Sequence, residues 1–357
     1  MVSSIQSGAR VLVTGATGYL GAAIAEQFIQ NGYIVVGSAR TLSKAENLKN
    51  FFDEKYGPGK FEIYASGDLT TEGAFDDAVK GTEDYVEAIA HVASPVGVES
   101  EDPMKDVVNV AIRGTTSILN SALQYGKNVK SVLVVSSLAS LLDPTVPEKY
   151  TYTEKDWNDA AIKSMIDLKE KRESIPGFVA YMASKTEAEH AVWKFKEDNK
   201  LPFTISTILP SWIYGTIVPT PRTVADVNAA STAAYVVQFY SGENKNYSQS
   251  FPPVGYVNVA DVARASVLIV EKNDITDGQR YILNAGPYSF QQIVDIMREN
   301  FPERQDIIVK GEPGNYEKAN QPKQHDGSKI THDLGIKYTD LETTVLDTIN
   351  SVKHVFQ

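Results

Sequence analysis

The stretch Arg10-Val-Leu-Val-Thr-Gly-Ala-Thr-Gly-Tyr-Leu-Gly21 decides the fold of this chain. It begins with a short run of β-branched and apolar residues, which is typical of a buried strand. Three glycines follow at the spacing G-x-x-G-x-x-G, and from Tyr19 to Gln30 apolar residues recur at helical intervals. A glycine turn between a strand and a helix leaves helix N–H groups free to bind phosphate. A purely structural tight turn is the alternative, and the strand–turn–helix context favours a dinucleotide site.

The same alternation of strands and helices continues outward from this stretch. Further strands are expected at residues 34–36, 61–64, 85–92, 131–135 and 203–209, and helices at 42–56, 104–125 and 181–199. Alternating strands and helices imply right-handed crossovers and a parallel sheet covered on both faces. The fold class is therefore α/β, with a Rossmann-type doubly wound sheet over residues 1–210.

The pattern changes after residue 210. Residues 211–253 are rich in Pro, Tyr, Ser and Thr, whereas strand and helix patterns reappear at 256–259, 260–272 and 280–283. We expect residues 254–285 to return to the sheet. Residues 211–253 and 286–357 are then expected to form a smaller C-terminal lobe that binds the substrate.

Composition narrows the function classes. The net charge of −11 opposes binding to nucleic acid and to anionic membranes, because both need a basic surface. With no cysteine there is no disulfide or thiol nucleophile, and the five histidines lack metal-ligand spacing. No signal-peptide pattern and no apolar run of about 20 residues is present. We therefore expect a cytoplasmic protein without metal, nucleic-acid or membrane partners.

The end of the second strand indicates which dinucleotide binds. NAD sites carry Asp or Glu about 20 residues after the glycine turn, where it binds the ribose 2′-hydroxyl. This chain has Gly37-Ser-Ala-Arg40 there, with Lys44 one turn later. An arginine offers charged donors to a 2′-phosphate, whereas an acid would repel it. The prediction is NADP(H), and the alternative for Arg40 is a solvated surface residue.

A tyrosine and a lysine four residues apart are the candidate acid–base pair. Chance alone supplies roughly one Y-x-x-x-K match in a chain with 18 tyrosines, and two occur here. Tyr56-Gly-Pro-Gly-Lys60 cannot be helical, whereas Tyr181-Met-Ala-Ser-Lys185 lies among helix formers, which puts both side chains on one face. A lysine ammonium stabilises the phenolate and draws the tyrosine pKa toward the working range.

Other strand ends supply further candidates, because ligands gather at the carboxyl ends of parallel strands. Ser136-Ser137 follows the fifth strand and offers hydroxyls to a carbonyl oxygen. Asp68-Leu69 either meets the adenine or caps the next helix. The segment His91-Val-Ala-Ser-Pro95 is expected to pass under the cofactor.

Together these motifs resemble the extended short-chain dehydrogenases/reductases, and most closely the fungal NADPH-dependent aldehyde and ketone reductases related to plant dihydroflavonol and cinnamoyl-CoA reductases. The landmarks cover essentially the whole chain, in order Val13-Thr-Gly-Ala-Thr-Gly18, Gly37-Ser-Ala-Arg40, His91-Val-Ala-Ser-Pro95, Val134-Val-Ser-Ser137, Tyr181-Met-Ala-Ser-Lys185, Ile208-Leu-Pro-Ser211 and Asp261-Val-Ala-Arg264. The segment 143–176 does not align with the family pattern.

The resemblance implies the residues of a carbonyl reductase site. The catalytic set is expected to be Ser137, Tyr181 and Lys185. The cofactor is expected to contact these last two together with Gly15, Thr17, Gly18, Tyr19, Leu20, Arg40, Lys44, Asp68, Leu69, Val92, Ala93, Ser94, Pro210 and Ser211. A small-molecule carbonyl substrate is expected to contact Pro95, Val96, Leu138, Trp212 and Tyr214.

Two rival functions remain at this point. A nucleotide-sugar epimerase or dehydratase has the same fold but favours an acid where Arg40 stands. A non-enzymatic NADP(H) sensor would not need the Tyr, Lys and Ser set. The sequence leaves the physiological carbonyl open, and the protein is expected to be a monomer or a homodimer.

Overall fold

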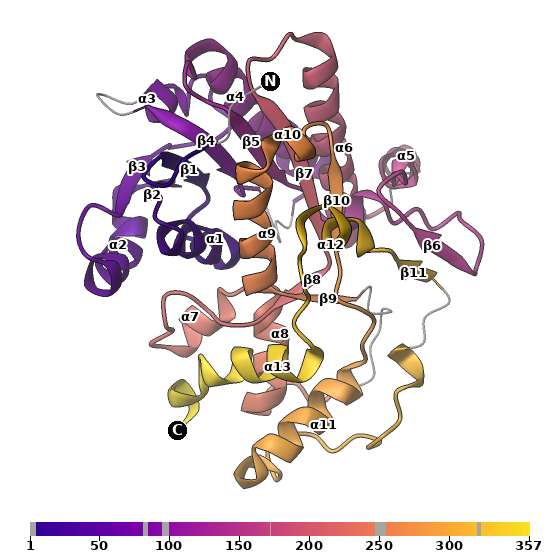
Figure 1. Ribbon diagram of the computed structural model, residues 1–357. Helices are drawn as coiled ribbons and strands as arrows, with labels where there is room; N and C mark the ends of the chain where they lie inside the picture. Colours follow the sequence, from indigo (N-terminus) through magenta and orange to yellow (C-terminus); the bar gives the residue numbers. More distant parts are fainter. Residues whose placement is uncertain (1–4, 81–84, 95–99, 172, 247–254, 320–322) are drawn as a thin grey trace.

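The architecture is a seven-stranded parallel sheet with helices on both faces and a second lobe below it (Figure 1). The computed structural model describes residues 5–80, 85–94, 100–171, 173–246, 255–319 and 323–357. The strand order is β10-β7-β5-β4-β1-β2-β3. The strands are β1 Arg10–Thr14, β2 Ile34–Ala39, β3 Phe61–Ala65, β4 Val86–His91, β5 Ser131–Val135, β7 Thr204–Pro210 and β10 Arg280–Leu283. The predicted fold class is confirmed.

Both faces of the sheet are buried, as the apolar strands predict. Along β1, Val11 and Val13 belong to one apolar cluster, and Leu12 between them belongs to another on the opposite face. One layer of packed helices comprises α1 Tyr19–Gln30, α2 Leu42–Tyr56 and α9 Val259–Glu271. The other comprises α3 Asp76–Lys80, α4 Asn109–Tyr125 and α6 Gly177–Asp198, with α5 Asp159–Glu170 packed outside α6.

The second lobe gathers the chain after β7. Its helices are α7 Val224–Asn228, α8 Thr232–Ser241, α11 Phe290–Asn300 and α13 Leu341–Asn350, and α8, α11 and α13 pack on one another. The short helices α10 Asn273–Thr276 and α12 Ser328–Leu334 lie beside the sheet domain (Figure 1). The apolar cluster beneath α1 and α9 continues into this lobe, so the two parts share one core.

Two small parallel sheets join segments that are distant in sequence. β8 Trp212–Tyr214 pairs with β9 Tyr256–Asn258, and β6 Tyr150–Tyr152 pairs with β11 Lys323–His325. Of the segments expected to return to the central sheet, β10 does so. β9 instead pairs with β8, because β10 already occupies the position beside β7.

Candidate active site

The glycine turn brings the end of β1 against the start of α1. Gly15 has a φ of +66°, and a Cβ there would lie 2.9 Å from the Cα of Ala93. A Cβ on Gly21 would lie 2.1 Å from the carbonyl oxygen of Gly15. The turn therefore excludes side chains at two of its three glycines, which leaves the backbone open to a phosphate.

Hydrogen bonds fasten this turn to the end of β4. The hydroxyl oxygen of Thr14 accepts from the N–H groups of Val92 and Ala93, both at 3.1 Å, and lies 2.8 Å from Nδ1 of His91. His91 is buried, and burial lowers its pKa to about 3, so the imidazole is neutral. His91 thus packs at a strand end as a structural residue.

A cleft of about 660 Å³ runs along the carboxyl ends of the strands. It gathers nearly all of the predicted cofactor and catalytic residues, namely Gly15, Thr17, Gly18, Tyr19, Leu20, Arg40, Lys44, Leu69, Val92, Ala93, Ser94, Ser137, Tyr181, Lys185, Pro210 and Ser211. Because all seven strands are parallel, residues that follow different strands reach the same edge of the sheet.

Arg40 and Lys44 stand exposed at one end of this cleft. Within the described residues, neither side chain donates a hydrogen bond to another residue. Two exposed cations beside an open glycine turn suit the 2′-phosphate and pyrophosphate of NADP(H). The residues present therefore fit the predicted cofactor.

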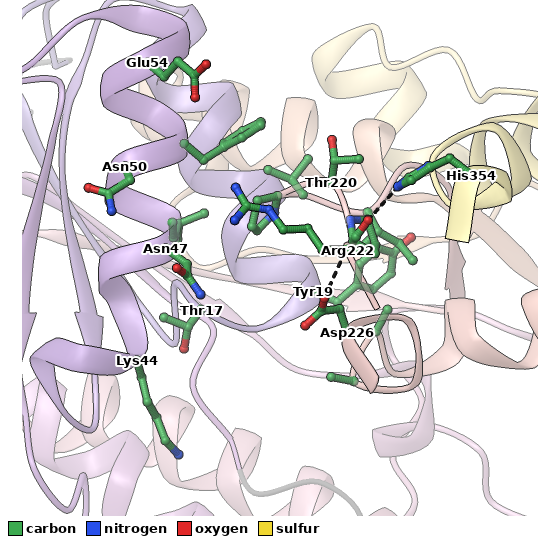
Figure 2. A pocket seen from close by; sticks show the side chains of 18 residues that line it. Thr17, Tyr19, Lys44, Asn47, Asn50, Glu54, Thr220, Arg222, Asp226 and His354 are labelled. Carbon is green, nitrogen blue, oxygen red and sulfur yellow. Dashed lines mark hydrogen bonds between the residues drawn. The ribbon is translucent and has the colours of Figure 1, made fainter. Parts of the chain in front are cut away.

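A second cavity of about 640 Å³ adjoins the cleft at this end and shares Thr17, Tyr19 and Lys44 with it (Figure 2). It separates α2 from the loop that carries Arg222, whose side chain points toward the helix. The hydroxyl of Tyr19 donates to the carbonyl of Gly215 at 3.0 Å. This bond ties the phosphate turn to the second lobe.

Tyr181 and Lys185 project from the second and third turns of α6 into the cleft. The Nζ of Lys185 lies 6.0 Å from the centre of the Tyr181 ring. Burial lowers the pKa of Lys185 to about 8, with the charge of Glu189 opposing the shift. The other Y-x-x-x-K match does not place its tyrosine and lysine on one helix face. The helix α2 ends at Tyr56, and Lys60 lies beyond it.

The pKa of Tyr181 differs from the sequence expectation. Burial raises it, and a side-chain hydrogen bond with Ser137 opposes the rise. The expected lowering by Lys185 is absent: burial disfavours the charged phenolate, and the one opposing effect comes from Ser137. A raised pKa keeps Tyr181 protonated at neutral pH, which is the state that a proton donor needs.

Ser137 is positioned by a tight turn after β5. It is the N-terminal cap of the 3₁₀ turn Leu138–Ser140, and its hydroxyl accepts from the N–H of Ala139 at 3.2 Å. Ser137 also lies near enough to Tyr181 to lower the pKa of its hydroxyl. The structure therefore brings the three predicted catalytic side chains together on one wall of the cleft.

Several predicted contact residues lie elsewhere. Asp68 is exposed, does not line the cleft, and accepts from the N–H of Thr70 at 2.9 Å within a turn, eight residues before α3 begins, so it does not cap that helix. Leu138 is buried in a separate apolar cluster. Pro95 and Val96 lie outside the described residues.

The two aromatic residues expected at the substrate are also displaced. Successive side chains of a strand point to opposite faces, and in β8 it is Ile213 that lines the cleft. Tyr214 is fully buried, with its hydroxyl 2.5 Å from that of Tyr288. The ring of Trp212 packs edge-on against Tyr235, 5.3 Å between centres. Of the three residues of β8, the cleft is thus lined by Ile213 and by neither Trp212 nor Tyr214.

The structure adds cleft residues that the sequence analysis missed. Those from the second lobe are Asn228, Ala229, Ser231 and Thr232, and others include Ser38, Ala39, Ser66, Gly67 and Phe75. Ser231 has a φ of +51°, which no other non-glycine residue in the described ranges matches in sign. Ser38 and Ala39 adjoin Arg40 and were detectable as its neighbours, whereas no sequence signal points to Ser231.

This fold and cleft define a nucleotide-dependent enzyme of the extended short-chain dehydrogenase/reductase type. The model of the NAD dependent epimerase/dehydratase family matches residues 11–286, and the chain belongs to that family. The predicted family is confirmed. No described helix is long and apolar enough to cross a membrane, and the described residues contain no cluster suited to a metal ion.

Proteins of similar sequence align with most of this chain and with most of their own length. Aldehyde reductase 2 of Sporidiobolus salmonicolor is 32% identical over 84% of this chain and 83% of its own. The NADPH-dependent methylglyoxal reductase GRE2 of Saccharomyces cerevisiae is 29% identical over 96% of this chain and 97% of its own. The crystal structure of yeast methylglyoxal/isovaleraldehyde reductase Gre2 complexed with NADPH is 28% identical, covering 97% of this chain and 98% of that one, with a TM-score of 0.83.

Proposed function

We propose that this chain catalyses the NADPH-dependent reduction of aldehydes and ketones to alcohols. The observation that carries the proposal is the meeting of Tyr181, Lys185 and Ser137 on one wall of a cleft whose far end holds Arg40 and Lys44. The similar proteins support the same reaction, since their names describe aldehyde and NADPH-dependent methylglyoxal reductases. The cofactor is NADPH, and the enzyme is an oxidoreductase.

The roles of the side chains follow from their protonation and position. Ser137 holds the carbonyl oxygen next to Tyr181, which donates a proton to that oxygen as the carbonyl is reduced. NADPH, when bound, supplies the hydride that the carbonyl carbon accepts. Lys185 carries a positive charge near neutral pH, orients the nicotinamide ribose and stabilises the phenolate that Tyr181 becomes. Solvent then returns the proton to Tyr181.

The other cleft residues hold the two reactants. Arg40 and Lys44 bind the 2′-phosphate, and the glycine turn binds the pyrophosphate. The lobe formed by 211–253 and 286–357 closes the substrate side, where Ile213 and Thr232 line the cleft. The substrate is a small-molecule carbonyl, and the protein acts in the cytoplasm as a monomer or homodimer without a nucleic-acid or membrane partner. The net charge of −11 supports that last exclusion.

Absorbance of the nicotinamide tests the reaction directly. Purified protein is mixed with NADPH or NADH and a panel of aldehydes, ketones and keto esters. We expect NADPH oxidation that is slower with NADH and that falls by roughly 10²-fold or more in Tyr181→Phe, while NADPH binding persists. Full turnover by a Tyr181→Phe protein would remove Tyr181 from the mechanism. Absence of turnover with every carbonyl would favour an epimerase or an NADP(H) sensor instead.

A further inference from the structure

A buried carboxylate lies behind the catalytic residues and has no part in the reaction as proposed. Tyr181, Lys185 and Glu189 occupy successive turns of α6 at intervals of four residues, so they share one face of the helix. The side chain of Glu189 is fully buried. A charge is costly in such a place unless it has specific partners.

The partners of Glu189 come from three neighbouring segments. Its Oε2 accepts from the hydroxyls of Ser136 and Ser140, each at 2.6 Å, in the turn after β5. Its Oε1 accepts from the hydroxyl of Thr207 on β7 at 2.8 Å and from Nε of Arg280 on β10 at 2.8 Å. One carboxylate therefore joins α6 to the turn after β5 and to the strands β7 and β10.

Arg280 balances this buried charge and extends the network. Burial pushes the pKa of Glu189 up, but the charge and hydrogen bonds of Arg280 outweigh that effect and keep the pKa below its usual value. The Nη1 of Arg280 also donates to the carbonyls of Glu154 and Asp156 at 2.7 and 2.8 Å. Its guanidinium stacks 3.6 Å from the centre of the Trp157 ring. The segment before α6 is thereby held to the same carboxylate.

The serines that Glu189 holds flank Ser137 in space. Ser136 precedes it in the chain, and the hydroxyl of Ser140 lies 2.9 Å from the carbonyl of Ser137. The N–H of Ser140 donates to the same carbonyl at 3.0 Å. Because both neighbours are fixed to one carboxylate, movement of Glu189 would move the hydroxyl that faces the substrate.

Glu189 also acts on Lys185 through its charge. Tyr181 and Glu189 lie one turn before and after Lys185 on α6, and Lys185 and the neutral His91 on β4 are close enough for the charge of Lys185 to lower the pKa of His91. Among these, Glu189 is the group whose charge raises the pKa of Lys185 against the effect of burial. Without that charge, Lys185 would lose its proton at a lower pH.

We propose that Glu189, paired with Arg280, is a positioning residue of this enzyme that fixes Ser137 through Ser136 and Ser140 and acts on Lys185 from one turn further along the same face of α6. The proposal deepens the proposed reductase function and rests on it for the roles of Ser137 and Lys185. Glu189 does not touch the reacting atoms, so its effects are indirect.

The test compares Glu189→Gln with Trp193→Phe. The first removes the negative charge in a side chain of the same size. The second removes the longest bond to the same carboxylate, from Nε1 of Trp193 to Oε1 at 3.4 Å, and leaves the charge in place.

Profiles of kcat and kcat/KM from about pH 6 to about pH 10 are recorded for both. We expect Glu189→Gln to lose about tenfold or more in kcat and to shift the alkaline limb by about one pH unit toward acid. In Trp193→Phe, the alkaline limb of the pH profile should lie at the same pH as in the original protein.

A merely structural Glu189 predicts a different result. It would lower the melting temperature and the amount of active protein, yet leave the limb unmoved, and this outcome overturns the proposal. If Glu189→Gln does not fold, the neutral pair Glu189→Gln with Arg280→Gln replaces it, with the same expected direction of shift. An unshifted limb there overturns the proposal as well.

A second readout separates this inference from the reductase function. The dissociation constant of NADPH is followed by its fluorescence over the same pH range, which requires no carbonyl substrate. As the pH rises, we expect NADPH binding to weaken at a lower pH in Glu189→Gln than in Trp193→Phe. The reason is that Lys185 loses its proton at a lower pH in Glu189→Gln. Identical binding profiles contradict the role of Glu189. Shifted profiles without any carbonyl turnover would retain it and remove the reductase proposal.

Discussion

Gly21 and Gly15 are in such close contact that a Cβ on Gly21 would lie 2.1 Å from the carbonyl oxygen of Gly15. No rotation of a side chain relieves this overlap, because the opposing atom belongs to the backbone. The contact sets the distance between the start of α1 and the end of β1. It therefore shapes the turn that faces the cofactor.

Gly21→Ala should destabilise the protein and weaken NADPH binding. The added methyl must push α1 away from the turn, which costs about 1–3 kcal/mol as an overpacking change. Denaturant unfolding and NADPH titration measure the two effects. The matched control is Gly177→Ala, at the start of α6, where a Cβ meets nothing within 4 Å. A Gly21→Ala protein as stable as Gly177→Ala would show that the turn relaxes freely.

Arg40→Ser should reduce the preference for NADPH over NADH. Loss of a charge-assisted bond to the 2′-phosphate is worth about 1.5–3 kcal/mol, or roughly 10- to 100-fold in the KM for NADPH. The KM for NADH should change little, because NADH lacks that phosphate.

Lys49→Ala is the control for this change, since Lys49 lies on the following helix α2, pairs with Asp53 and lines neither cavity. The ratio of kcat/KM for the two cofactors is the measurement. An unchanged ratio in Arg40→Ser would mean that Arg40 is only a solvated surface residue.

The reaction rate of the unmodified protein should fall as the pH rises through about 8. Burial lowers the pKa of Lys185 to about 8, so above this pH the ammonium loses its proton and no longer stabilises the phenolate. Tyr181 adds no fall in this range, because burial raises its pKa and keeps the proton donor loaded. His91 adds no acid limb near neutrality, since its pKa is about 3.

A profile of kcat/KM at constant ionic strength checks this expectation. Lys185→Arg, which retains its charge throughout, should be slower at neutral pH but lose the decline near pH 8. If kcat/KM of Lys185→Arg still declines near pH 8, a group other than Lys185 causes the decline.

Local patterns predicted the sheet and the cofactor end of the cleft well. The helix expected from Tyr19 to Gln30 and the strand from Arg10 to Thr14 have those bounds in the structure. Gly15 and Arg40 could be proposed because each follows a strand, and Tyr181 because it lies with Lys185 in a short helical motif. Their meeting follows from the parallel arrangement of the strands, which the alternating pattern already implied.

The sequence contains less information about the substrate side of the cleft. β8 has three residues, too few for its alternation to show which side chains face the cleft, and Trp212 and Tyr214 were expected where Ile213 lies. Ser231 and Thr232 line the cleft from the second lobe. No short sequence motif indicates how this lobe packs on the sheet. Glu189 was visible in the sequence as a helical residue after Lys185, but its role depends on Arg280, 91 positions away.

By itself, the sequence determined the α/β class, the dinucleotide site, the cationic end that suits NADP(H) and the Tyr–Lys pair. These features depend on periodicity and on contacts within a few residues, which local physical chemistry dictates. Only the tertiary structure decided which residues of the second lobe line the cleft, that β9 pairs with β8, and that Glu189 and Arg280 form a buried pair behind the catalytic wall. Such contacts depend on how distant segments share buried space and satisfy one another's hydrogen bonds, and no single stretch of sequence contains that information.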